Sequence, residues 1–432
     1  MFEFITLSPS GSTTPTTEQR SSSQQDSADE DDAYDPMALD SDSKVKQESK
    51  ENDNDIAILP HSTPVQTGIT QARLLTFDKQ INILADPGWD GKSDLSYLEE
   101  IVPKVDLIIL SHTTIEYLGA YAMLLYKYPI LRRIKTYSTL PIAKLGRLAT
   151  TELYRAMGLI GPIESAIMEV DDIESAFNNI ISLNYAQSIG LQGNLTGITI
   201  TSYNSGHTLG GSIWQFNRGA EKIVYAPAWN HSKDSFLVNS KLNLPNLMRP
   251  TTLISGSDLG SSKSHKHRVE EFLKLANVTL NNNSTLFLPT SMTGRFFELI
   301  LLLEKNIDLN IPFYLVSYTG VKSMQFSANM LEWMSSDITK NWETQNQSPF
   351  ESTRIQLITL QELEQLDQGP KILFTESLDM SEGSLGRACL ATLCTRHHTA
   401  IMMTEGPHPD STFYDLYAEW ERLVSQDNRL KS

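Results

Sequence analysis

Short hydrophobic runs alternate with amphipathic stretches from residue 69 onward, and this alternation predicts strands and helices in turn. Residues 69–90 are typical of two strands joined by a turn near Asp78. Residues 105–111 predict a buried strand. Residues 140–158 repeat apolar positions at helical spacing up to Gly158, a residue type that commonly follows a helix. Further elements of this first block are a helix at 171–181 and strands at 195–206, 211–216 and 222–229.

A second block of the chain repeats strand–helix pairs. Strands that alternate with helices are typical of a mostly parallel sheet covered by helices on both faces. The second block is therefore expected to form an α/β unit of its own. Its predicted strands are 251–258, 284–290, 311–318, 370–377 and 399–405, and its predicted helices are 266–280, 294–306, 322–343, 381–395 and 411–426.

Residues 9–66 form a polar, acidic tract that is predicted to be disordered. The tract is rich in Ser, Thr, Gln, Asp and Glu, so it cannot bury enough apolar surface to offset the entropy lost on ordering. The short segment before it, residues 2–8, has the pattern of a strand. We therefore interpret the tract as a loop inserted after a first strand, and the alternative is an N-terminus that is disordered throughout.

The charge of the chain narrows the possible functions. The 432 residues carry a formal net charge of −17 and an isoelectric point near 5.0, which argues against a generic nucleic-acid binder but permits local basic patches. The two cysteines are too few for a disulfide framework. No run approaches the roughly 18 apolar residues of a membrane span. An intracellular protein, nuclear or cytoplasmic and without a membrane partner, is expected.

The segment SHTTIEYLGA follows the buried strand at 105–111. Two-zinc hydrolases can supply four ligands from one such loop, in the order His-x-His-x-Asp-His. Imidazoles and carboxylates then hold two metal ions about 3.5–4 Å apart and generate a hydroxide nucleophile. The segment resembles this second motif of the metallo-β-lactamase fold. His112 keeps the first histidine, whereas Thr114, Glu116 and Tyr117 replace the second histidine, the aspartate and the last histidine.

Three other segments resemble the remaining motifs of this fold, in the expected order. ILADPGWD resembles the first motif, whose carboxylate, here Asp86, orients neighbouring loops more than it binds metal. YNSGHTLGGSIW resembles the third motif, and His207 stands at its metal-binding histidine. VYAPAWNHS resembles the fourth motif, and Ala228 stands where an aspartate bridges both metal ions.

The ligand positions hold too few metal-binding side chains for two-metal hydrolysis. Without the bridging carboxylate and two of the imidazoles, a bound water would not be acidified. We therefore expect no catalytic residue, no bound metal and no cofactor, with His112 and His207 as hydrogen-bonded core histidines. The alternative is a single residual zinc held by His112, Glu116 and His207.

Together with the second block, these motifs resemble metallo-β-lactamase proteins that carry a β-CASP cap, a group that processes nucleic acids. In the cap's first motif, TTLISGSDLGSS, Gly256 stands where an acid is expected. GHTLGGSIW, ANMLEWMSSDITKNWE and SEGSLGRACL are similar to the fungal form of the non-catalytic subunit family of the cleavage and polyadenylation specificity factor. The resemblance implies an α/β fold, a metallo-β-lactamase-like αββα sandwich with an inserted β-CASP parallel-sheet domain.

The resemblance also implies how the chain is divided. Residues 1–8 would be the first strand of the sandwich and residues 9–66 an acidic insertion. The sandwich would continue over 67–240, the cap would cover 241–396, and residues 397–432 would return to the sandwich, which is truncated there.

A non-catalytic, RNA-binding scaffold of pre-mRNA 3′-end processing is the implied function. It would pair with a homologous active zinc endonuclease and other cleavage and polyadenylation factors in the nucleus. Two alternatives remain open: an active metal-dependent RNA phosphodiesterase with atypical ligands, and an inactive subunit of another RNA-processing complex such as Integrator. Possible RNA-binding side chains, for which solvated loops are the alternative, are Lys263, Lys266 and Arg268 in one cluster and Arg132, Arg133 and Lys135 in another.

Overall fold

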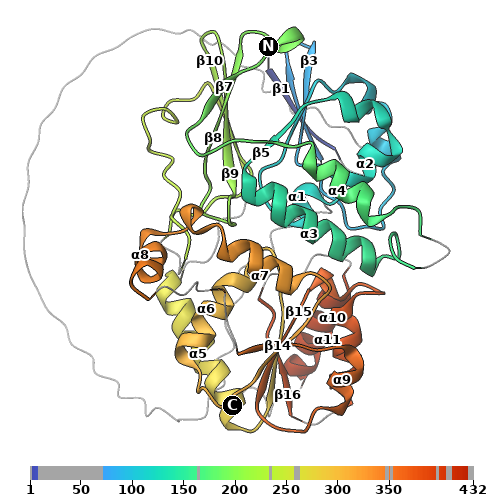
Figure 1. Cartoon of the computed structure of the whole chain (residues 1–432), viewed down its shortest axis with the longest axis vertical. Helices are drawn as coiled ribbons and strands as arrows, with labels where there is room; N and C mark the ends of the chain where they lie inside the picture. The colour runs from blue at the N-terminus through green and yellow to red at the C-terminus, as the bar shows by residue number, and fades with distance from the viewer. Residues whose placement is uncertain are drawn as a thin grey trace, which may run out of the picture.

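The computed structural model describes most of the chain outside the acidic tract. The described residues are 2–7, 72–162, 166–232, 236–256, 263–345, 350, 354–395, 398–404 and 411–426. The predicted disordered insertion at 9–66 lies outside them. Two lobes lie one above the other in Figure 1. We call the lobe with β1–β11 and α1–α4 the sandwich lobe, and the lobe with β12–β16 and α5–α11 the cap.

The first sheet of the sandwich lobe joins the start of the chain to the first block. Its outer strands β1, β2 and β3 pair antiparallel, and β3 to β6 pair in parallel. The strand order is β1 (Phe2–Leu7), β2 (Ala72–Phe77), β3 (Ile81–Ala85), β4 (Leu107–Ile109), β5 (Thr136–Ser138) and β6 (Ile181–Ser182).

The second sheet packs on the first through alternating side chains. Trp214 and Phe216 point between the sheets and join one apolar cluster with Leu75 and Ile83 of the first sheet. The neighbouring Ile213 points to the opposite face, as the two-residue period of a strand requires. The strand order is β11 (Thr252–Ser255), β10 (Glu221–Ala226), β9 (Ser212–Arg218), β8 (Ile198–Asn204) and β7 (Ser188–Gly190).

Helices cover the outer face of the first sheet. The longest, α3, buries Leu145 and Leu148 toward the cap and Leu153 toward its own lobe, so it separates the two lobes in Figure 1. Within the described residues, the outer face of the second sheet packs against loop residues such as Leu247 instead. The covering helices are α1 (Ile115–Leu118), α2 (Tyr121–Lys127), α3 (Leu140–Ala156) and α4 (Val170–Asn178).

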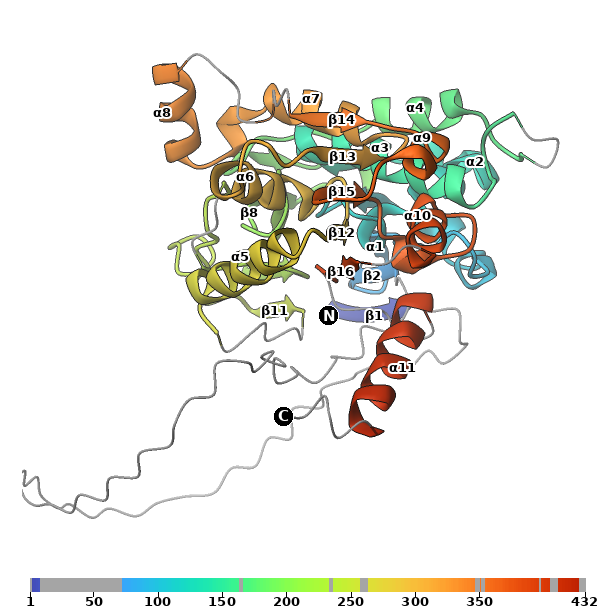
Figure 2. The ribbon, with the colours of Figure 1, turned by 90° about the horizontal axis from the view of Figure 1, so that it is seen from below.

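The cap is a parallel sheet between two layers of helices, as Figure 2 shows. All five residues of its central strands β12 and β15 are buried. The strand order is β14 (Ile355–Leu357), β13 (Phe313–Val316), β15 (Lys371–Thr375), β12 (Thr285–Pro289) and β16 (Thr399–Ile401). One layer contains α5 (His265–Asn281), α6 (Phe296–Asn306), α7 (Gly320–Ala328) and α8 (Ser336–Gln345), and the other contains α9 (Leu360–Gln365), α10 (Leu385–Cys394) and α11 (Thr412–Gln426).

The α/β sandwich with a parallel-sheet cap confirms the predicted fold class, but three local predictions differ from the structure. Residues 252–255, expected to open the cap, form β11 and pair with β10 in the sandwich. Residues 399–401, expected to lie in the returning sandwich segment, pair with β12 of the cap. The single helix expected at 322–343 breaks between α7 and α8, where Met330 and Trp333 turn into the core.

Buried hydrogen bonds join the two lobes. Glu152 of α3 is 2% exposed and accepts hydrogen bonds from Ser317 Oγ at 3.1 Å, Tyr318 N at 3.1 Å and Thr319 Oγ1 at 2.8 Å. Thr113 and Thr293 each donate a hydroxyl hydrogen to the other's carbonyl oxygen, at 2.8 Å and 3.1 Å. The loop that carries the candidate site is therefore hydrogen-bonded directly to the cap. No helix within the described residues is long and apolar enough to cross a membrane.

Candidate functional site

The four motif segments meet because their strands end at the same edge of the sandwich. β3 and β4 are parallel neighbours. β8 and β10 each pair antiparallel with β9, so they run in the same direction. Carboxyl ends of strands that run in the same direction lie together, and these ends are where ligands bind in α/β folds. We call Asp86, His112, Tyr117, His207 and Ala228 the motif cluster.

Asp86 is the hydrogen-bond centre of the motif cluster. It is fully buried, has a left-handed backbone conformation with φ 49°, and accepts hydrogen bonds from Ser111 N at 2.7 Å, Ser111 Oγ at 2.6 Å and Tyr225 Oη at 2.6 Å. Burial raises the pKa of Asp86, while the positive charge of Arg73 and the hydrogen bonds from Ser111 and Tyr225 oppose that rise. The carboxylate ties the loop after β3 to β4 and to β10.

Both ring nitrogens of His112 are engaged by serine hydroxyls. Nδ1 lies 2.7 Å from Ser111 Oγ and Nε2 lies 3.2 Å from Ser205 Oγ. The buried ring also contacts Tyr117 and His207, with ring centroids 4.6 Å and 5.4 Å apart. His207 is exposed, so the prediction of a core histidine is wrong at that position. Burial and the charge of His207 lower the pKa of His112, so its imidazole is neutral. A metal ion on Nε2 would have to displace Ser205.

A family model and two related proteins show which family the motif cluster comes from. A family model described as a metallo-beta-lactamase superfamily domain matches residues 74–254. A Saccharomyces cerevisiae protein named Cleavage factor two protein 2 is 33% identical over 84% of this chain, and a Drosophila melanogaster protein named Probable cleavage and polyadenylation specificity factor subunit 2 is 30% identical over 78%. Residues 74–254 form a metallo-β-lactamase superfamily domain. The resemblance inferred from the motifs is confirmed, because relatives named cleavage and polyadenylation specificity factor subunit 2 match most of this chain.

The matched relatives are more than twice as long as the stretch they share with this chain. The chain spans 44% of the Saccharomyces cerevisiae protein and 45% of the Drosophila melanogaster protein. A Schizosaccharomyces pombe protein named Endoribonuclease ysh1 is 24% identical over 74% of this chain and 41% of that protein.

The donor set of this metallo-β-lactamase domain does not fit a two-metal centre. Within the described part of the chain, no three His, Cys, Asp or Glu side chains are grouped so that they could hold a metal ion. Ala228 interacts with the His112 ring through its backbone and offers no side-chain ligand. Thr114 precedes α1, and its methyl carbon lies 3.4 Å from the position of a Cβ on Gly294 of the cap. Glu116 is in the first turn of α1, and its carbonyl oxygen packs against Gly88.

Gly256 adjoins the fourth motif in space, because β11 and β10 are parallel neighbours. Its N–H donates to Ala226 O at 3.2 Å, and a Cβ at this position would lie 2.1 Å from Pro227 O. An acidic side chain, which the β-CASP pattern expects here, therefore has no room.

We predict that Gly256→Asp lowers the free energy of unfolding by roughly 2–3 kcal/mol, because the backbone must move to admit a Cβ. Urea denaturation followed by circular dichroism measures the loss. Gly190→Asp is the control, because Gly190 is exposed in β7 and a Cβ there meets no atom within 4 Å. Equal losses for the two variants would contradict this interpretation.

Arg73 was not recognised from the sequence, although the structure places it at the motif cluster. It is the only charged residue in β2, a strand whose other residues are buried. Its guanidinium carbon lies 5.9 Å from the centroid of the Tyr117 ring, and it hydrogen-bonds Tyr225. Burial lowers the pKa of Arg73, but the interactions with Tyr225, Asp86 and Tyr117 outweigh burial and raise the pKa overall. Both tyrosines are neutral phenols at physiological pH, so Asp86 is the only acid among these three groups. A lone charge in an apolar strand was the signal that could have revealed it.

The two predicted basic clusters lie on different lobes. Lys263 pairs with Glu271 at 2.7 Å and Lys266 with Glu270 at 3.8 Å, at the start of α5 in the cap. Arg132 Nε donates to Leu125 O at 3.2 Å, in the short 3-10 helix that follows α2 in the sandwich lobe. Figure 1 shows α2 and α5 at opposite sides of the molecule. The two clusters, which also include Arg268, Arg133 and Lys135, therefore do not form one continuous basic surface.

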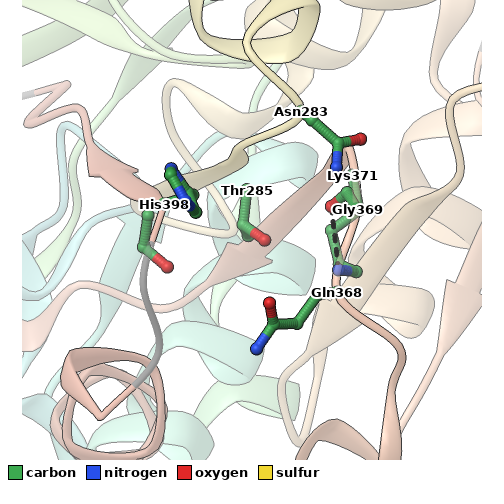
Figure 3. A pocket seen from close by; sticks show the side chains of 7 residues that line it. Asn283, Thr285, Gln368, Gly369, Lys371 and His398 are labelled. Carbon is green, nitrogen blue, oxygen red and sulfur yellow. Dashed lines mark hydrogen bonds between the residues drawn. The ribbon is translucent and has the colours of Figure 1, made fainter.

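A small pocket in the cap lies at the wrong end of the sheet for a ligand site. Figure 3 shows Thr285, Lys371 and His398 around it, and Thr285 and Lys371 are the first residues of β12 and β15. Its volume of about 30 Å³ is near that of a single water in liquid. Lys371 Nζ donates to the carbonyl oxygens of Asp367 at 2.7 Å and Gly369 at 2.9 Å. We interpret the pocket as the packed amino end of the sheet.

Proposed function

We propose that the chain is a non-catalytic, RNA-binding scaffold subunit of the nuclear machinery that cleaves and polyadenylates pre-mRNA. In this proposal it pairs with a homologous, active zinc endonuclease and contacts other cleavage and polyadenylation factors. Two relatives that match most of the chain support this proposal, since one is named as a cleavage factor protein and the other as a probable cleavage and polyadenylation specificity factor subunit. The observation that carries the non-catalytic part is the methyl group of Ala228 at the position of the bridging carboxylate.

The chemistry of the motif cluster supports this proposal. Metal-assisted phosphodiester hydrolysis needs a hydroxide made from bound water, and a metal generates it only when fixed ligands hold the ion in place. His112 and His207 retain imidazoles, but Nε2 of His112 is engaged by Ser205 and Tyr117 replaces a third imidazole. Asp86, the one buried carboxylate of the cluster, is engaged by Ser111 and Tyr225.

RNA binding would use cations of both lobes. The exposed ones are Lys266, Arg132, Arg133 and Lys135. Contacts to a phosphate backbone are electrostatic and weaken as salt rises. Glu270 and Glu271 already pair with Lys266 and Lys263, so the cap cluster must exchange these partners for phosphates. The sandwich cluster, with Arg132, Arg133 and Lys135, is the stronger of the two candidates for this reason.

We predict that His207→Ala leaves RNA cleavage unchanged when the variant is assembled with the nuclease subunit and its other partners. His207 is exposed, so the substitution removes a ligand-type side chain without opening the core. Cleavage of a pre-mRNA substrate by the reconstituted complex is the measurement, and a metal-ligand variant of the nuclease subunit is the inactive control. A loss of ten-fold or more with His207→Ala would contradict the non-catalytic role.

Co-purification separates this proposal from the two alternatives. The proposed subunit recovers cleavage and polyadenylation factors and contains no stoichiometric zinc. A metal-dependent phosphodiesterase would contain zinc and cleave RNA alone, a possibility raised by the likeness to Endoribonuclease ysh1. Recovery of Integrator subunits in place of polyadenylation factors would assign the chain to that complex.

A further inference from the structure

We propose that Arg73 is an internal cation that takes over the electrostatic role of the metal ions in the motif cluster and excludes divalent metal from it. The cluster does not fit a metal, and a permanent positive charge lies beside its one buried carboxylate. The proposal rests on the non-catalytic part of the proposed function and adds a residue that acts on the cluster through its charge.

The position of Arg73 follows from strand register. Arg73 in β2 is paired with Ala85, the last residue of β3, and the next residue of the chain is Asp86. The antiparallel register therefore places an arginine at the carboxyl end of β3, at the edge where the motif cluster lies. A neighbouring position in β2 would point to the other face of the sheet.

Three groups beside Arg73 favour a cation, and one guanidinium nitrogen, Nη1, is buried without a hydrogen-bond partner. Asp86 interacts with it by charge, and Tyr225 hydrogen-bonds it and donates its own hydroxyl hydrogen to Asp86 at 2.6 Å. The Tyr117 ring centroid lies 5.9 Å from the guanidinium carbon, within the range of a cation–π contact. Tyr117 stands at the position of a histidine ligand, so the residue that replaced a metal ligand contacts the cation that replaces the metal.

The same arrangement opposes metal binding. A buried guanidinium remains charged at every accessible pH. A divalent ion next to it would meet strong repulsion, because charges interact strongly in a site of low dielectric. The negative charge of the Asp86 carboxylate is already compensated by Arg73 and by three hydrogen-bond donors. Restoring ligand side chains alone would therefore leave the charge of the site unfavourable for zinc.

Zinc titration of two designed chains tests this. The first carries Thr114→His, Tyr117→His and Ala228→Asp, and the second carries Arg73→Met in addition. We expect the second chain to bind zinc at least ten-fold more tightly by chelator competition, with zinc chloride as the only added metal. Arg218→Met in the same background is the control, because Arg218 pairs with Asp78 at 2.7 Å outside the motif cluster. Equal affinities with and without Arg73 would overturn the proposal.

A double-mutant cycle in the native background gives an independent result if the designed chains do not fold. Arg73→Lys keeps the charge and is expected to keep most of the melting temperature, whereas Arg73→Met lowers it. Arg73→Met combined with Asp86→Asn should lower it by less than the sum of the two single losses, because both charges of the pair are then removed. Equal losses for lysine and methionine, or strictly additive losses, would overturn the proposal.

The two proposals fail in distinguishable ways. Stoichiometric zinc in the unaltered chain would overturn both the non-catalytic function and the exclusion of metal by Arg73. Equal zinc affinities in the two designed chains would overturn only the role of Arg73.

Discussion

Substitution of Glu152 by alanine is expected to lower the free energy of unfolding by roughly 3 kcal/mol, because it leaves one buried donor and two partly buried hydrogen bonds without their acceptor. The carboxylate of Glu152 belongs to the sandwich lobe, and its three donors lie in the cap segment from Ser317 to Thr319. The substitution therefore weakens the contact between the sandwich lobe and the cap. Urea denaturation measures the stability, and limited proteolysis of the native state measures whether the lobes separate.

Glu152→Gln is the matched control, and it also tests the protonation of this site. Glutamine keeps the shape and one carbonyl acceptor, and its amide can donate to the hydroxyls of Ser317 and Thr319, so we expect less than half of the alanine loss. Burial raises the pKa of Glu152 despite its hydrogen bonds. The folded chain therefore binds this proton more tightly than the unfolded chain. The contribution of Glu152 to the free energy of unfolding falls as the pH rises above the ordinary pKa of a glutamate.

The pH dependence gives a second measurement for the same pair of chains. The difference in unfolding free energy between the native chain and Glu152→Gln should shift against the native chain over the pH window that begins at the ordinary pKa of a glutamate and extends upward, because only the native chain loses a proton there. A constant difference over that window, or an alanine variant as stable as the glutamine variant, would contradict the interpretation of this contact.

Asp86→Ala is the second substitution with a large expected effect, a loss of roughly 3–5 kcal/mol. Removing one partner of a buried charge pair leaves the other charge uncompensated, and Arg73 is that partner here. Ser111 N, Ser111 Oγ and Tyr225 Oη lose their acceptor at the same time. Alanine also tolerates the positive φ of this position poorly.

Asp86→Asn separates these causes. Asparagine tolerates a left-handed backbone and keeps an oxygen that accepts from Ser111 N, but it removes the same negative charge as alanine. We therefore expect a loss that is smaller than that of alanine and that reports mainly the missing charge. Thermal unfolding of both variants measures the difference. If asparagine were as damaging as alanine, the charge rather than the hydrogen-bond geometry would dominate. If both were neutral, the proposed centre of the cluster would be wrong.

Much of the fold could be predicted from local patterns. The buried strands at 105–111, 284–290 and 370–377 correspond to β4, β12 and β15, because a short apolar run must be covered on both faces wherever it lies. The helix predicted at 140–158 is α3. Predictions failed where pairing between distant segments decided the outcome, as for β11 and β16, since strand partners are chosen by tertiary packing.

The chemistry of the candidate site divides in the same way. That position 228 is a methyl group and position 117 a phenol is a property of the sequence alone, and no fold can make the methyl group of Ala228 bind zinc. The tertiary structure decided which other groups surround the former ligand positions. Strand register placed Arg73 beside Asp86, and the parallel pairing of β10 and β11 closed the space at Gly256. Both depend on residues far apart in the chain, and no local pattern of polar and apolar positions encodes such a distance.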